Sequence, residues 1–149
     1  MNRSGLLIPD SDKLHHDLMK SFERGAIGGA SIEIPGAGIE AQARFGLIAG
    51  HAYSLTAALK TNTGAKLVCL RNPWGQVEWE GKWHDEDECW DEVDEELSNI
   101  LRSEKEDGEF WMDIDDFTTF FSKVELCNIS VKILIRALQY GPYCMTQTI

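Results

Sequence analysis

The sequence lacks a long hydrophobic run, a secretory leader pattern and an excess of positive charge. No apolar stretch in its 149 residues approaches the roughly 18 needed to cross a bilayer, so no integral membrane segment is expected. The opening residues, Met1–Asp10, hold only a short apolar patch, too short for the hydrophobic region of a secretory signal. The net charge of −11 argues against nucleic acid and anionic membrane surfaces as partners, and it favours a cation ligand instead.

Cysteines are few and widely spaced. The four thiols, Cys69, Cys89, Cys127 and Cys144, form no C-x-x-C pair, which argues against a zinc site. Their even number leaves disulfides open, but the missing secretory signal and the size of the chain favour reduced thiols in a cytoplasmic protein. A free cysteine usually behaves as a small buried hydrophobe, and we expect that of most of these four.

The length of the chain corresponds to about one domain. The first two segments with a periodic apolar pattern predict a helix followed by a strand. The helix carries an apolar stripe and is predicted to start at a cap on Ser11 or Asp12 and to end at Gly25. The doublet His15–His16 within it is interpreted as a surface pair in preference to a metal site. Strict alternation over Ala30–Ile34 predicts a short strand.

The middle of the chain predicts a β-hairpin. Two segments with strand character, Gly50–Leu59 and Ala65–Asn72, are separated by the polar turn sequence Thr61–Gly64. In such a hairpin, His51 and Asn72 lie at the strand ends opposite the turn, so residues distant in sequence are expected to meet.

His51, Asn72 and Trp74 match the parts with which a papain-like cysteine protease activates its thiol. An imidazole takes the thiol proton, an amide oxygen orients the imidazole, and an apolar ring keeps water off the pair. A lone histidine at a strand end is more often structural, so this pattern alone leaves a structural role for His51 open.

From Glu78 to Glu96 the chain holds eleven acidic residues against one base, Lys82. Three tryptophans interrupt this acidic segment, which predicts that it packs against the protein and is not a disordered tail. These tryptophans are Trp79, Trp83 and Trp90.

The remaining sequence alternates between helical and strand patterns. Asp94–Arg102 predicts a short helix, Asp107–Met112 a turn entering a strand, and Asp113–Phe121 an amphipathic helix. Lys123–Ile129 alternates as a further strand. The last stretch, Ser130–Ile149, has no clear period, and no element is predicted there.

Several motifs occur in the order in which calpains carry them, and the sequence resembles that family over most of its length. They are Gly50-His51-Ala52-Tyr53-Ser54, Arg71-Asn72-Pro73-Trp74-Gly75, Glu78-Trp79-x-Gly81-x-Trp83, Glu106-Asp107-Gly108-Glu109-Phe110-Trp111-Met112 and Leu126-Cys127-Asn128. Calpains are calcium-dependent cysteine endopeptidases of the papain superfamily. The resemblance implies an α+β fold: an antiparallel, β-rich subdomain like the right-hand lobe of papain, with a few helices. It places the second half of a protease core at residues 1–129 and leaves 130–149 as a divergent stretch.

The resemblance implies that His51 is the general base, that Asn72 orients it and that Trp74 covers the pair. It also implies a first, cysteine-bearing half of the core, marked by a Gln-Gly-x-x-Gly-Asp-Cys-Trp-like segment that this sequence does not contain. The chain alone is therefore expected to be inactive, with protein substrates cleaved only by the complete enzyme. Two alternatives remain: a non-catalytic calcium-binding or regulatory module, and a site reconstituted from two chains.

The resemblance further implies a calcium site in which two acidic loops converge on one ion. Calcium prefers six to eight hard oxygen ligands. The implied ligands are the side chains of Glu78, Asp85, Asp107 and Glu109, with a backbone carbonyl near Lys105. Most of the other acidic residues from Glu86 to Glu96 are expected to form a solvated face.

Overall fold

The computed structural model describes residues 10–33, 41–42, 44–75, 78–102, 108–127 and 146–148. In chain order the elements are α1 (Ser11–Glu23), β1 (Ile27–Ser31), β2 (Ala41–Gln42), β3 (Ile48–Ala49), β4 (Ala52–Lys60), β5 (Lys66–Arg71), the 3₁₀ helix η1 (Glu88–Glu92), α2 (Glu95–Leu101), β6 (Glu109–Asp113), α3 (Ile114–Phe120), β7 (Lys123–Cys127) and β8 (Thr146–Thr148).

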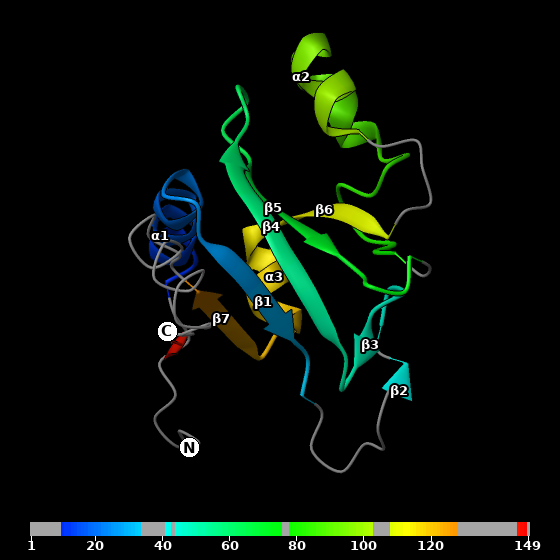
Figure 1. Ribbon diagram of the computed structural model, residues 1–149. Helices are drawn as coiled ribbons and strands as arrows, with labels where there is room; N and C mark the ends of the chain where they lie inside the picture. The colour runs from blue at the N-terminus through cyan, green and yellow to red at the C-terminus, as the bar shows by residue number, and fades with distance from the viewer. Residues whose placement is uncertain are drawn as a thin grey trace, which may run out of the picture.

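The strands form one six-stranded sheet, ordered β6-β5-β4-β1-β7-β8, and a separate pair, β2-β3. Every pairing is antiparallel, which confirms the α+β fold with an antiparallel sheet. The predicted hairpin is the β4–β5 pair, and both of its strands are interior strands of the sheet. Figure 1 shows α2 far from the region where α1 and α3 lie. No helix in the described part of the chain combines the length and the apolar character that a bilayer crossing requires.

Strand β5 is buried on both faces, and its alternate residues enter two different cores. Val68 and Leu70 belong to a larger core that includes residues of α1 and α3. Leu67 and Cys69 belong to a smaller core. Because successive side chains of a strand point to opposite faces, the central hairpin is covered on both sides and held firmly in place.

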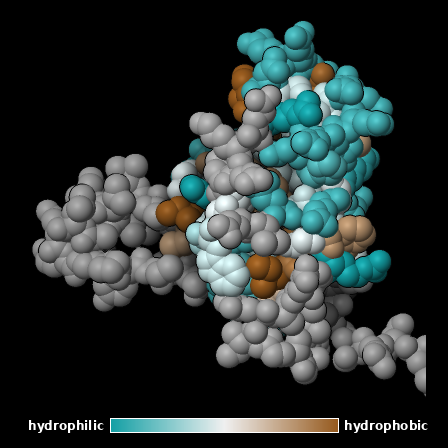
Figure 2. Space-filling model, turned by 90° about the vertical axis from the view of Figure 1, so that its right-hand side faces the viewer, coloured by the Kyte–Doolittle hydropathy of each residue, from teal (hydrophilic) through white to brown (hydrophobic). Residues whose placement is uncertain are grey.

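The smaller core explains why the acidic segment is folded. Trp83 and Trp90 are buried in it against Trp111 of β6, and their two rings meet edge to face with centroids 5.0 Å apart. Leu97 and Leu101 of α2 pack against the same core. Most acidic side chains of the segment point to solvent, and hydrophilic residues cover the upper part of the face seen in Figure 2. The prediction that the tryptophans pack is therefore confirmed.

Asp87 differs from its exposed acidic neighbours because it caps η1. Its carboxylate accepts the backbone N–H of Cys89 at 3.0 Å and that of Trp83 at 2.6 Å. Burial opposes ionisation of this carboxyl, but the backbone donors outweigh burial, and the pKa of Asp87 is lowered. Sequence alone could not distinguish this carboxylate from the others in the run.

Replacing Asp87 by alanine is expected to lower the free energy of unfolding by about 1 kcal/mol at neutral pH, the typical loss for a helix N-cap. A lowered folded-state pKa contributes stability above the unfolded pKa of roughly 4, and this stability is lost as the pH falls through the folded-state pKa. The difference between wild type and Asp87→Ala should therefore shrink as urea unfolding is repeated toward about pH 3. The exposed neighbour Glu88, changed to alanine, is the matched control; an equal loss there would contradict the capping role.

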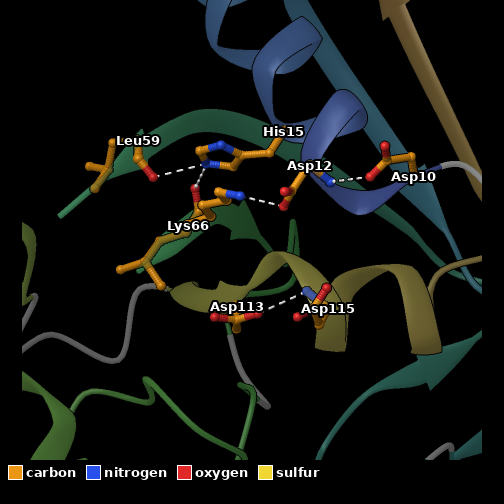
Figure 3. Close-up of polar contacts among 8 residues, drawn as sticks. Asp10, Asp12, His15, Leu59, Lys66, Asp113 and Asp115 are labelled. Atoms are coloured by element: carbon orange, nitrogen blue, oxygen red, sulfur yellow. Dashed lines mark hydrogen bonds and ion pairs between the residues drawn. The ribbon is translucent and has the colours of Figure 1, made fainter. Parts of the chain in front are cut away.

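Helix α1 begins at an Asp10 cap, not at the predicted Ser11 or Asp12, because the Asp10 carboxylate accepts the Asp12 N–H at 3.1 Å. The freed Asp12 carboxylate pairs with Lys66 of β5, and this ion pair lowers the pKa of Asp12 (Figure 3). The cap is thus shifted by one or two residues, and an ion pair ties the start of α1 to the hairpin.

The interpretation of His15–His16 as a surface pair is wrong for His15, which is 3% exposed. Its Nε2 lies 2.9 Å from the carbonyl oxygen of Leu59 and 3.2 Å from that of Leu67, at the turn end of the hairpin (Figure 3). Carbonyls are acceptors, so Nε2 carries the proton. Periodicity within α1 could not reveal these acceptors, because they belong to strands far along the chain. His16 is exposed, as expected.

Strand β1 lies earlier than the predicted Ala30–Ile34; Ile34 is outside the described residues. A Cβ at Gly28 would come within 2.9 Å of the Leu55 carbonyl oxygen, so β1 and β4 approach closely only because that residue is glycine. The prediction relied on the alternation of apolar and polar residues, which begins only after the two glycines of β1, and it therefore placed the strand too late.

The predictions of α2, β6, α3 and β7 are confirmed, with boundaries shifted by one or two residues. Residues 128 and 129 of the predicted last strand lie outside the described residues. In the stretch after residue 129, Thr146–Thr148 pairs with Glu125–Cys127 of β7. The proposed division of the chain at residue 129 stays a prediction.

Candidate active site

His51 and Asn72 meet at the end of the β4–β5 hairpin opposite its turn. His51 directly precedes β4, Asn72 directly follows β5, and the His51 Nε2 lies 2.9 Å from the Asn72 Oδ1. Both residues are buried, with exposures of 7% and 0%. The juxtaposition expected from the hairpin pattern is therefore present.

A second hydrogen bond fixes which way the Asn72 amide points. The backbone N–H of Trp74 donates to Asn72 Oδ1 at 3.0 Å. A backbone N–H is only a donor, so the atom it meets must be the amide oxygen. The same oxygen then requires a proton on His51 Nε2, which leaves Nδ1 as the unprotonated ring nitrogen. The site thus holds an imidazole whose free nitrogen can accept a proton, in a fixed tautomer.

The Trp74 ring lies against the imidazole, with 4.3 Å between ring centroids and 51° between ring planes. The residue is 51% exposed, so the indole contacts His51 and still faces solvent over much of its surface. The position of the ring beside His51 was expected from the sequence. The additional hydrogen bond from the Trp74 backbone to Asn72 was not.

Gly108 accepts a hydrogen bond from the backbone of Asn72, and this role was not predicted from the sequence. Its carbonyl accepts the Asn72 N–H at 2.7 Å, and its own N–H donates to Glu78 Oε1 at 2.9 Å. Its φ of +81° is one that residues with a side chain rarely adopt. The only signal in the sequence was the Asp-Gly-Glu turn, which does not reveal its neighbours.

Tyr53 is a further residue that sequence reasoning missed. It is buried on β4, and its ring meets the imidazole of His51 edge to face, with 5.2 Å between centroids. Nothing in the local pattern separates it from the other strand residues.

The implied calcium ligands are only partly within the described residues. Glu78 is hydrogen-bonded to Gly108, so the acidic segment and the loop before β6 come together. Glu109 opens β6 opposite Arg71, and the backbone carbonyl of Asp85 accepts the Arg102 Nε–H. Lys105 and Asp107 lie outside the described residues. Among the residues that are described, no group of three or more His, Cys, Asp or Glu side chains could hold a metal ion.

Cys69 and Cys89 lie in settings unlike that of an activated thiol. Cys69 is buried in the smaller core, on β5. Burial and the neighbouring Asp87 raise the pKa of the Cys89 thiol, whereas a nucleophilic cysteine needs a lowered pKa. Cys127 ends β7, and Cys144 is outside the described residues.

A family model described as calpain family cysteine protease matches residues 5–128. The chain is similar to the calpain-2 catalytic subunit of Mus musculus, with 44% identity over 117 residues covering 76% of this chain and 17% of the relative. It is similar to the calpain-1 catalytic subunit of Gallus gallus, with 42% identity over 81% of this chain and 18% of that relative. Calpain-8 of Rattus norvegicus is 40% identical over 80% of this chain and 18% of its own length. The chain thus spans less than a fifth of each of these relatives.

Proposed function

Because this chain belongs to the calpain family of cysteine proteases, we propose that it forms part of a calcium-dependent cysteine endopeptidase. In this proposal His51 is the general base and Asn72 orients it. The observation that carries the proposal is the shared amide oxygen, which accepts His51 Nε2–H and the Trp74 N–H and so leaves Nδ1 free to take a proton.

The chemistry begins with transfer of a thiol proton to Nδ1 of His51, which creates a thiolate and an imidazolium. The bond from Nε2–H to the neutral Asn72 amide holds the imidazolium without adding a negative charge. The thiolate attacks the peptide carbonyl, the imidazolium returns its proton to the leaving amine, and water then hydrolyses the thioester. Trp74 shields the His51–Asn72 bond from water, and lower local dielectric strengthens it.

The nucleophile is proposed to come from a cysteine-bearing half of the core, so that this chain is inactive alone. The buried position of Cys69 and the raised pKa of Cys89 support this reading. Protein substrates and a cytoplasmic location belong to the same proposal.

Glu78, Asp85, Asp107, Glu109 and the carbonyl of Lys105 are proposed to hold one calcium ion. The donor set is chemically suited, since carboxylate and carbonyl oxygens are the ligands calcium prefers. The contact between Glu78 and Gly108, the residue between Asp107 and Glu109, supports the approach of the two loops. A bound calcium would supply a fixed positive charge that ties these loops together.

Calcium is expected to raise the thermal unfolding temperature of the purified chain by several degrees at millimolar concentration. A ligand that binds only the folded state stabilises it by about 2.7 kcal/mol at a hundredfold excess over its Kd. Replacing Asp107 by alanine should abolish the shift. The exposed acidic residue Glu92, replaced by alanine, removes the same charge outside the proposed site and should leave the shift unchanged.

Equal shifts in wild type and Asp107→Ala, or no shift in wild type, would contradict the calcium site. A calcium shift combined with no activity in a core that also carries the cysteine half would instead favour the alternative of a non-catalytic calcium-binding module.

A further inference from the structure

Tyr53 contacts the His51 imidazole and also bonds to the segment that leads into His51. It is 2% exposed, and its ring stands nearly perpendicular to the imidazole, at 88° with 5.2 Å between centroids. Its hydroxyl oxygen accepts the backbone N–H of Ile48 at 2.9 Å. A single side chain therefore meets both the ring and its backbone approach.

The hydroxyl bond closes the turn on which His51 is carried. Ile48 lies in β3 and Tyr53 in β4, and the bond between them spans the connection that contains Gly50 and His51. The Gly50 N–H donates to the Ile32 carbonyl at 2.8 Å, a second anchor of the same turn. These two bonds limit how far the backbone at His51 can shift.

The Tyr53 ring is itself held by other aromatic rings. It meets Phe110 of β6 edge to face at 6.0 Å and Phe121 at 5.4 Å. All three residues belong to the larger core. Since packed core side chains keep defined rotamers, the face that Tyr53 presents to the imidazole is fixed.

We infer that Tyr53 is a positioning residue for His51. Its ring sets the plane of the imidazole, so that Nε2 points at Asn72 and Nδ1 is left for proton transfer. Its hydroxyl holds the Ile48–His51 turn. This inference rests on the proposed function in one respect: a catalytic consequence follows only if His51 is the general base.

The test compares Tyr53→Leu, which removes the aromatic ring and the hydroxyl, with Tyr53→Phe, which removes only the hydroxyl, each made in the full chain. Nitrogen-15 NMR of the His51 imidazole reports its tautomer, its titration and the solvent exchange of Nε2–H, while amide exchange reports Ile48. The matched control is Phe117→Leu, a buried aromatic of the same core whose ring stacks on that of Phe121.

Tyr53→Leu is expected to speed Nε2–H exchange about tenfold or more and to make the Nδ1–H tautomer detectable. Tyr53→Phe is expected to keep the tautomer and to speed Ile48 amide exchange by a similar factor. Phe117→Leu should leave the tautomer of His51 as in wild type, although it also destabilises the core.

A wild-type tautomer and exchange rate in Tyr53→Leu, or an equal change in Phe117→Leu, would overturn the inference. If Tyr53→Leu does not fold, Tyr53→Phe decides, and unchanged Ile48 exchange there would overturn it. Failure of the proposed function would look different: wild type itself would lack the single Nε2–H tautomer, or a complete core would lack activity while the Tyr53 effects on His51 persisted.

Discussion

Replacing His51 by alanine is expected to lower kcat/KM on the order of 10⁴-fold when the chain works together with a cysteine-bearing half of the core. Without the imidazole, no group takes the thiol proton, and the reactive thiolate fraction falls. Asn72→Ala should cause a smaller loss, because the base remains but its tautomer and orientation are no longer fixed. Peptide cleavage under single-turnover conditions measures both effects.

The matched control for this prediction is His16→Ala, the same substitution at an exposed histidine of α1. It should leave activity unchanged. A His51→Ala enzyme that retained most of its activity would rule out the general-base role. The chain by itself is expected to cleave nothing. Turnover by the chain alone that a thiol alkylator blocks would contradict the proposal that its nucleophile comes from elsewhere.

Replacing Gly108 by alanine is expected to lower the free energy of unfolding by about 3 kcal/mol. A Cβ there would lie 2.6 Å from the Asn72 carbonyl oxygen and 2.9 Å from the Gly75 Cα. Both are backbone atoms, so they cannot turn aside as a flexible side chain would. The positive φ costs roughly 1–2 kcal/mol, and forced overpacking adds about 1–3 kcal/mol. Urea unfolding measures the loss through the midpoint concentration.

Gly25 supplies an unusually close control for Gly108. It has the same φ of +81°, but a Cβ there meets nothing within 4 Å. Gly25→Ala should therefore show only the conformational cost of about 1–2 kcal/mol. The difference between the two variants isolates the clash at Asn72. Equal losses in both would mean that Asn72 and Gly75 yield to the new methyl group, contrary to the rigid support described above.

The hairpin and its two end residues could be predicted because their signals are local. Strand character over the segments before and after the Thr61–Gly64 turn is sufficient to pair β4 with β5, and pairing brings His51 to Asn72. The short elements α2, α3, β6 and β7 followed from the periodicity of their apolar residues in the same way. In each case the residues that decide the structure are neighbours in sequence.

The surroundings of the site could not be predicted, because their partners are distant in sequence. The two carbonyl oxygens that lie within hydrogen-bonding distance of His15 belong to the hairpin. The carbonyl that accepts the backbone N–H of Asn72 belongs to Gly108. Asp87 resembles every other acid in its run until its two backbone donors are seen. Likewise, the start of β1 was predicted too late, because the sequence does not show that Leu55 lies close to Gly28.

By itself, the sequence determined the antiparallel hairpin, the meeting of His51 with Asn72 and the resemblance to calpains. The hairpin and the meeting of its end residues depend on the order and spacing of residues in one short stretch, and the resemblance depends on the order of motifs along most of the chain. Only the tertiary structure decided the tautomer of His51, through the Trp74 N–H on the Asn72 oxygen, and brought Tyr53 and Gly108 to the site. The physical reason is that hydrogen-bond direction and ring contact depend on atoms within a few ångströms in space, whatever their separation in sequence.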